Sequence, residues 1–203
     1  MSATRLLVLG VVRMHGGTHG YRVGRDLMDW GAKEWANVKW GSIYHALRKF
    51  AEQGKLREFV APGDEVADRT SYELTEDGEA EFHRLLRGAL SHGGDDHAFL
   101  CAGITLMTCL PRGTAIECLR ERLTAMEKSD GEVVRAIDSA EEEWGKPAHV
   151  RELFRFWHHA IDAGVAWTRG LIASLEAGEY VMADEHPTAF GVPPSRPGTP
   201  TRT

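Results

Sequence analysis

The chain has 203 residues, of which 42% are hydrophobic and 27% charged, with a net charge of −6 and three cysteines. This composition is that of a globular protein with one or two cores. The longest early apolar run, Leu6 to Val12, falls well short of the ~20 residues that a membrane span needs. An odd number of cysteines in helical, apolar surroundings argues against a disulfide framework. We therefore expect a soluble, cytoplasmic protein with reduced thiols.

The charge is unevenly distributed along the chain. Up to Thr75 there are 11 Lys and Arg against 9 Asp and Glu, and the remaining residues have 13 against 21. A slightly basic first third, with its charges gathered on one face, can bind phosphates locally while an acidic remainder faces away. The negative total is thus compatible with a nucleic-acid partner.

Three helices are predicted in the first 53 residues. The first covers Thr4 to Met14 and ends at two glycines. The second covers about Thr18 or His19 to Trp30, and Gly31 ends it. The third covers Val38 to Gln53.

The third predicted helix has two different faces at 100° per residue. Its apolar face carries Ile43, Leu47 and Phe50, with Ala46 at the edge. Its polar face carries His45, Arg48 and Glu52, flanked by Tyr44 and Lys49. Ser42 lies near the start, where its hydroxyl can cap backbone N–H groups, and Gly54 stands where a left-handed C-terminal cap is expected. Such a short, two-faced helix suits an approach to phosphates and base edges.

A hairpin and a further helix follow. Leu56 to Val60 and Thr70 to Leu74 flank an acidic loop, a pattern typical of two paired strands. A helix begins at Thr75, has acidic residues in its first turn, and runs to about Leu90. Residues 1–90 therefore predict a winged helix-turn-helix, an α+β unit in a mainly α protein.

The second half is predicted to be a helical dimerisation and effector domain over residues 91–182. A break in composition at Ser91 to Asp96 marks its start. From Ile116 to Trp144, apolar positions recur at spacings of three and four, a heptad seam whose charged member is Asp130. A second helix, His149 to Ala177, repeats the pattern, so we expect an antiparallel pair that also packs on a second copy. The expected dimer contacts are Leu119, Leu123, Met126, Ile137, Trp144, Ile161 and Leu171.

The chain ends in a proline-rich segment. Residues 184–203 hold five of the eight prolines and little apolar content, which predicts a disordered tail from residue 183.

Aromatic residues are concentrated in the helical half. One interpretation is a pocket for a small aromatic effector, and the other is simple core and interface packing. The candidate pocket residues are Phe154, Trp157, His158 and Trp167. No Gly-x-Ser-x-Gly, phosphate-binding glycine loop or metal-ligand spacing occurs, so we expect no enzyme, no cofactor and no metal site.

Several short motifs occur in order within the first 90 residues. They are Leu6-Leu7-Val8-Leu9-Gly10, His19-Gly20-Tyr21, Gly41-Ser42-Ile43-Tyr44 with Ala46-Leu47, Gly54-Lys55-Leu56 and Tyr72-Glu73-Leu74-Thr75-Glu76-Asp77-Gly78. Together they resemble the PadR family of transcriptional regulators. The family usually has proline where this chain has His45, and an aromatic pair after a basic residue where it has Arg69-Thr70-Ser71-Tyr72. The operator sequence is therefore not carried over.

The resemblance and the helix pattern together imply a dimeric repressor that binds a pseudo-palindromic operator in double-stranded DNA. Release by a small aromatic effector is the further hypothesis that belongs to the pocket interpretation of the aromatic residues. The expected DNA contacts are Tyr21, Arg22, Arg25, Lys39, Ser42, Tyr44, His45, Arg48, Lys49 and Arg69. Arg57, on the first strand of the hairpin, is a further candidate. The alternative is a winged-helix protein-interaction or ligand-sensing module without DNA binding, because fold alone does not decide function.

Overall fold

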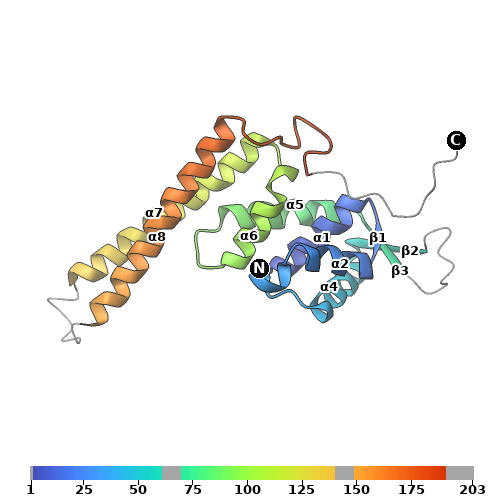
Figure 1. Ribbon diagram of the computed structural model, residues 1–203, viewed down its shortest axis with the longest axis horizontal. Coiled ribbons are helices and arrows are strands. Elements are labelled where there is room, and N and C mark those ends of the chain that lie inside the picture. Colours follow the sequence, from blue (N-terminus) through green and yellow to red (C-terminus); the bar gives the residue numbers. More distant parts are fainter. Residues whose placement is uncertain (1, 61–69, 140–148, 191–203) are drawn as a thin grey trace.

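The structure is a computed structural model that describes residues 2–60, 70–139 and 149–190 (Figure 1). Its elements in chain order are α1 Ala3–His15, β1 Thr18–His19, α2 Gly20–Asp29, α3 Ala32–Ala36, α4 Trp40–Glu52, β2 Leu56–Val60, β3 Thr70–Leu74, α5 Glu76–Ser91, α6 His97–Leu106, the 3-10 turn η1 Met107–Cys109, α7 Arg112–Ser139 and α8 Val150–Glu176. The predicted winged helix-turn-helix with a helical second part is confirmed. No helix within the described residues is both long enough and apolar enough to span a membrane.

Helix α1 is the centre of the N-terminal unit. It is apolar on nearly every side, and its residues from Leu6 to Val12 are completely or almost completely buried. A helix of this kind is stable only when other elements surround it, and α2, α4, α5, α6 and β3 all pack against it. This packing fixes where α2 and α4 stand relative to each other.

The sheet has three antiparallel strands in the order β1-β3-β2. Strands β2 and β3 pair as the predicted hairpin, with Leu56 opposite Leu74. Strand β1 differs from the prediction of helix from residue 18, because Thr18 pairs with Tyr72 before α2 begins. Gly16 and Gly17 both have positive φ and turn the chain onto the edge of β3. A two-residue strand is too short to produce an alternating sequence pattern.

Helix α3 is a second element that the sequence pattern did not predict. It has five residues and lies between Gly31 and Asn37, both in the left-handed region. Five residues are too few for a recognisable period of 3.6. The turn shortens the third predicted helix, so that α4 begins at Trp40 rather than at Val38.

The base of the wing is tied to the start of α5. Thr75 caps this helix by accepting a hydrogen bond from Gly78 N at 3.1 Å, and its hydroxyl donates to Gly54 O at 2.7 Å. A Cβ at Gly78 would lie 2.0 Å from Lys55 O, so only glycine fits there. The predicted start of this helix at Thr75-Glu76 is confirmed.

Helix α6 packs on the N-terminal unit rather than on the long helices. It contacts α1, α3 and α5, and a Cβ at Gly10 would lie 2.7 Å from Leu106 Cδ1. The loop predicted at residues 91–96 is present between α5 and α6, yet one hydrophobic cluster runs from α1 through α6 into the first turns of α7. The division at residue 91 stays a prediction.

Helices α7 and α8 form an antiparallel arm that extends away from the winged unit (Figure 1). Leu119 and Met126 on α7 and Thr168 and Leu175 on α8 are buried between or beneath them. Asp130, the charged member of the predicted seam, meets His158 at 2.6 Å. The last two positions of that seam, residues 140 and 144, lie outside the described residues.

The chain after α8 returns toward the winged unit. Met182 is buried, Arg112 binds Glu185 and the carbonyl oxygens of Leu175 and Tyr180, and the Phe190 ring meets Trp30 edge-on at 5.9 Å. Residues 183–190 thus make specific contacts, which differs from the disordered tail predicted from residue 183. Contacts of this kind cannot be read from composition, which is averaged over the segment. Residues 191–203 lie outside the described part.

Candidate nucleic-acid interface

Helix α4 presents the two faces predicted from its sequence. Ile43, Leu47 and Phe50 are completely buried, and Ala46 nearly so. The side chains on the opposite side are exposed: Tyr44, His45, Arg48, Lys49 and Glu52. The exposed face is thus held in place by the burial of the other.

The two ends of α4 are capped by backbone geometry and one hydroxyl. Lys39 N donates to Ser42 Oγ at 3.1 Å, and the same hydroxyl donates to Lys39 O at 2.7 Å. Gly54, with φ of 69°, allows Lys55 N to reach Phe50 O at 2.9 Å. Both predicted caps are therefore present. Because the Ser42 hydroxyl is engaged with the backbone, Ser42 defines where the helix begins.

The predicted basic residues differ in how far their charges are already paired. Arg22 forms an ion pair with Asp26 at 3.1 Å, without hydrogen-bond geometry at Nε. Lys49 donates to Glu52 at 2.7 Å, and this hydrogen bond lowers the pKa of the Glu52 carboxyl. Arg25 and Arg48 are exposed and form no ion pair within residues 2–60, 70–139 and 149–190. These two guanidinium groups are the most available for phosphate.

A row of stacked aromatic rings joins α2 to α4. Trp40 lies between Tyr21, with ring centroids 5.7 Å apart, and Tyr44, 6.4 Å away. All three are substantially exposed, at 50% for Tyr21, 39% for Trp40 and 43% for Tyr44. Sequence analysis did not single out Trp40. The available signal was a pair of glycines four residues apart on α2, Gly20 and Gly24, which face these rings.

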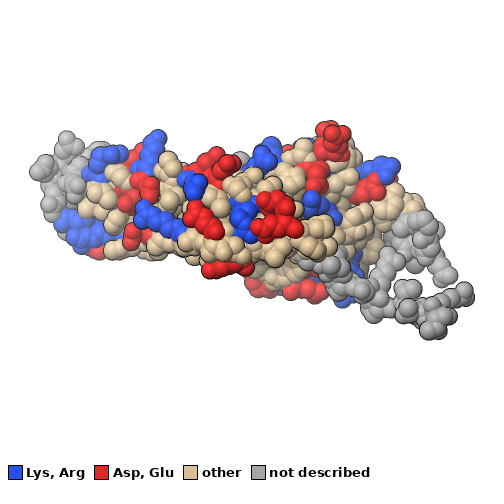
Figure 2. All heavy atoms as spheres, turned by 90° about the horizontal axis from the view of Figure 1, so that it is seen from above, with Lys and Arg blue, Asp and Glu red and all other residues tan. Residues whose placement is uncertain are grey.

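The wing offers one described cation. Arg57 on β2 is largely exposed, but its Nε donates to Glu73 Oε1 on β3 at 2.6 Å. Arg69, the other predicted contact from this region, lies outside the described residues, as does the acidic loop. Charges on the arm are mixed: Figure 2 shows basic and acidic side chains interspersed along one face.

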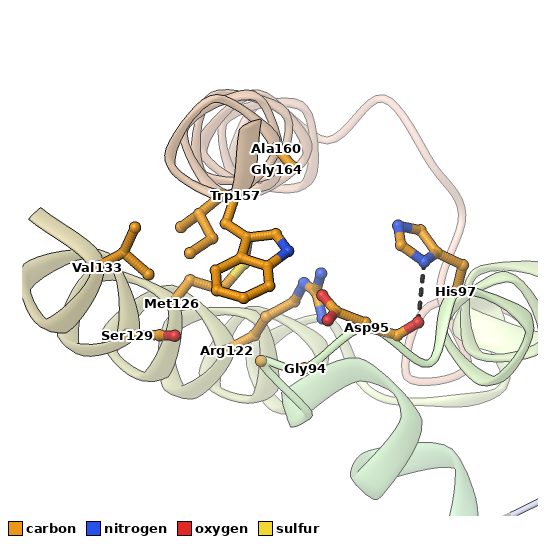
Figure 3. Close-up of a pocket in the computed structure, with 12 residues that line it drawn as sticks. Gly94, Asp95, His97, Arg122, Met126, Ser129, Val133, Trp157, Ala160 and Gly164 are labelled. Carbon is orange, nitrogen blue, oxygen red and sulfur yellow. Dashed lines mark hydrogen bonds between the residues drawn. The ribbon is translucent and has the colours of Figure 1, made fainter. Parts of the chain in front are cut away.

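The helical half contains a cavity of about 290 Å³ between α7, α8 and the loop that precedes α6 (Figure 3). Its lining residues are Gly93, Gly94, Asp95, His97, Arg122, Met126, Ser129, Val133, Trp157, Ala160, Ile161 and Gly164. Of the four predicted pocket residues, Trp157 alone lines this cavity. Phe154 packs against Trp157 edge-on, His158 turns to Asp130, and Trp167 is exposed farther along α8.

The polar side chains that line this cavity are Asp95, His97, Arg122 and Ser129. Of these, Arg122 is the buried cation, and sequence analysis missed it. It is only 6% exposed, and one Nη donates to His92 O at the end of α5. Its Nε has no hydrogen-bond partner within the described parts of the chain. Burial lowers the pKa of the guanidinium, because desolvation disfavours the charged form. A buried cation with an unused donor is a site for an acceptor.

The predicted dimer contacts divide into two groups. Leu119 and Met126 are buried within the protomer, so they are not available to a second copy, whereas Leu123, Ile137, Ile161 and Leu171 are half-buried. Trp144 lies outside the described residues. The apolar side chains that α8 leaves exposed are others: Leu153, Phe156, Trp157 and Trp167. The heptad pattern identified the seam between α7 and α8. Phe156 and Trp167 lie on a different side of α8, whereas Trp157 borders the cavity between the two helices.

Within the described residues, no group of three or more His, Cys, Asp or Glu side chains is arranged to hold a metal ion. The three cysteines are free. Burial raises the pKa of the Cys109 thiol to about 11, which keeps it protonated and unreactive.

The N-terminal unit matches a known protein family by sequence. Residues 8–84 match the sequence model of the Transcriptional regulator PadR-like family. A comparison with curated proteins gives no match.

Three solved structures similar to the chain are described by their sequence identity, coverage and TM-score. Bacillus subtilis PadR in complex with operator DNA is 19% identical, with 84% of this chain and 98% of that chain covered and a TM-score of 0.37. The same B. subtilis protein in complex with p-coumaric acid is 18% identical, with 86% and 99% covered and a TM-score of 0.36. The smu.1604c protein of Streptococcus mutans UA159 is 20% identical, with 88% and 99% covered and a TM-score of 0.37.

Proposed function

Since residues 8–84 match the sequence model of the PadR-like family of transcriptional regulators, we propose that the chain is a dimeric repressor that binds a pseudo-palindromic operator. The observation that carries this proposal is the exposed face of α4, where Arg48, which has no ion pair in the described part of the chain, accompanies Tyr44 and His45. A capped helix with such a face fits the major groove, where arginine and histidine donors can reach base edges.

Helix α2 supports the same surface from the side. Arg25 and Tyr21 are exposed near its outer face, and both side chains are suited to phosphate oxygens. Lys39, just before α4, is exposed as well. Arg22 and Lys49 contribute less charge, because carboxylates already pair with them. The Ser42 hydroxyl is engaged in capping α4, so Ser42 contributes by fixing where the helix begins. Arg69 remains a candidate DNA contact from the wing.

The dimer is proposed to form through the exposed face of α8. Leu153, Phe156, Ala160, Ala163 and Trp167 are all exposed, and their spacings of three and four place them on one side of the helix. An apolar stripe of this length is costly in water and marks an interface. A second copy is the occupant that fits, because it would present two α4 helices to half-sites about 34 Å apart.

The cavity beneath Trp157 is proposed to bind a small aromatic effector. Trp157, Met126 and Ile161 supply apolar walls, and Asp95, His97 and Ser129 line the polar side. The unused Nε of Arg122 supplies one donor for an acidic group. Pockets that are mostly apolar with a few placed polar groups are typical of small-molecule sites. Figure 3 shows the indole above the Arg122 side chain. A ligand there touches both helices of the arm and the loop to α6, so its binding can change the spacing of the α4 helices.

One experiment tests the central proposal. Purified protein is used to select bound fragments from random DNA, and the recovered sequences are compared. We expect an inverted repeat with half-sites one helical turn apart. Recovery of no enriched sequence would contradict operator binding and favour a protein-interaction module. A parallel titration of tryptophan fluorescence with benzoate and with benzamide tests the cavity, and Arg122→Met should remove any preference for the acid.

A further inference from the structure

The three stacked rings of Tyr21, Trp40 and Tyr44 form a continuous row, called here the aromatic shelf. It spans the first turns of α2 and α4 and borders the exposed face of α4 that carries Arg48. The interplanar angles are 22° and 25°, so the rings are nearly parallel. Exposed aromatic rings are usually free to change rotamer, whereas these are held by one another.

Two glycines of α2 fix the position of the shelf. A Cβ at Gly24 would lie 2.0 Å from Trp40 Cζ3, and a Cβ at Gly20 would lie 2.8 Å from Tyr44 Cε1. The rings therefore rest directly on the backbone of α2. Since the six-membered ring of the indole meets Gly24, the edge that carries Nε1 is on the opposite side of the ring system.

The polar atoms of the shelf are donors without partners. The structure gives no hydrogen bond for Trp40 Nε1 or for the hydroxyls of Tyr21 and Tyr44 within the described residues. An indole N–H can only donate, and a phenol O–H donates readily. The exposed cations Arg25, Lys39 and Arg48 are each within four residues of one of these rings along the chain.

We infer that the aromatic shelf binds the sugar–phosphate backbone of DNA through neutral hydrogen bonds, with Trp40 Nε1 as a contact in addition to the tyrosine hydroxyls. This inference rests on the proposed function. Tyrosine hydroxyls and backbone N–H groups commonly donate to phosphate oxygens. The rings lose little conformational freedom on binding, since packing already fixes them.

Neutral donors leave a signature that cations do not. A lysine or arginine that neutralises a phosphate releases a counterion, and each such contact adds about 0.9 to the slope of log K against log salt for B-DNA. A neutral donor adds affinity without adding to this slope. The shelf and the arginines can therefore be distinguished by measuring affinity at several salt concentrations.

The test uses the full chain and a fluorescent duplex of random sequence, with anisotropy measured between about 0.05 and 0.2 M salt. Tyr21→Phe, Tyr44→Phe and Trp40→Phe are expected to weaken binding about 3- to 10-fold each at every salt concentration, with the slope unchanged. Arg48→Ala, as the charged comparison, should lower the slope by about 1.

On the duplex recovered by the selection experiment the protein has one register, so methylphosphonate substitution there, one phosphate at a time, identifies the acceptor. At the phosphate that Trp40 contacts, replacing the charged oxygen should remove the difference between the parent protein and Trp40→Phe. The Tyr→Phe variants keep the shape of the ring, so they report on the hydroxyl even if Trp40→Phe fails to fold.

Shelf variants that bind as tightly as the parent, or that change the slope as Arg48→Ala does, would overturn the inference while leaving DNA binding intact. A parent protein that binds no duplex would instead overturn the proposed function, and the shelf with it.

Discussion

Replacing Gly24 by alanine tests whether the close approach of α2 to Trp40 holds the two helices together. The new Cβ would lie 2.0 Å from Trp40 Cζ3, whereas carbon atoms in contact are about 3.5–4.0 Å apart. The indole or the helix must therefore move by about 1.5 Å or more. Overpacking of this kind costs about 1–3 kcal/mol, and removing a glycine from a helix returns about 0.5–1 kcal/mol.

The expected net result is a lower free energy of unfolding, by up to about 2.5 kcal/mol. Gly131→Ala is the matched control, since its Cβ would meet only Arg135 Nη1 at 3.9 Å in the middle of α7. That change should stabilise the protein by about 0.5–1 kcal/mol. Urea unfolding followed by circular dichroism, at one protein concentration, measures both.

A double-mutant cycle isolates the contact with Trp40. In a Trp40→Ala background the indole is absent, so Gly24→Ala should stabilise the protein as much as Gly131→Ala does. If Gly24→Ala is stabilising in the parent as well, the ring does not constrain this glycine, and the reasoning about the aromatic shelf's rigidity fails.

Three further predictions follow from named contacts. Arg25→Ala and Arg48→Ala should each lower the salt slope of DNA binding by about 1, and Lys49→Ala should lower it less, because Lys49 already pairs with Glu52. Arg120→Ala, a change on the arm, should leave DNA binding unaltered, and equal effects of all four would refute the assignment. Phe156→Asp should convert the proposed dimer into monomers in sedimentation analysis, because the side chain is 67% exposed on the proposed interface, whereas Arg155→Asp beside it is the control. Arg84 and Lys55 hold the pKa of the buried Glu81 carboxyl down to about 2, so its stabilising contribution is present above pH 4.5 and is lost as the pH falls toward 2. Glu81→Gln should therefore flatten the dependence of stability on pH in that range, and an unchanged pH profile would contradict the pairing.

The sequence predicted the winged unit in most of its detail. The two faces of α4, the cap at Gly54, the hairpin and the start of α5 at Thr75 all depend on periodicity or on the chemistry of single residues near in sequence. These signals are local, and the structure confirms them. The same holds for the pairing of α7 with α8, since a heptad seam records which side of a helix is buried.

Elements too short to show a period were missed. Strand β1 has two residues and α3 has five, and both depend on neighbouring residues in the left-handed region. Strand β1 forms because β3 provides an edge to pair with, and α3 forms against α6. Such surfaces are assembled from distant parts of the chain.

The sequence by itself determined the fold class, the resemblance of the first 90 residues to the PadR family and the helix that is proposed to enter DNA, because burial and capping leave a periodic pattern in the residues themselves. Only the tertiary structure decided which exposed groups remain available for binding. It paired Arg57 with Glu73 across the hairpin, left Arg48 exposed, stacked Trp40 on Gly24 and buried Arg122 beside a cavity. The availability of a side chain depends on its neighbours in space, and most of those neighbours are remote in sequence.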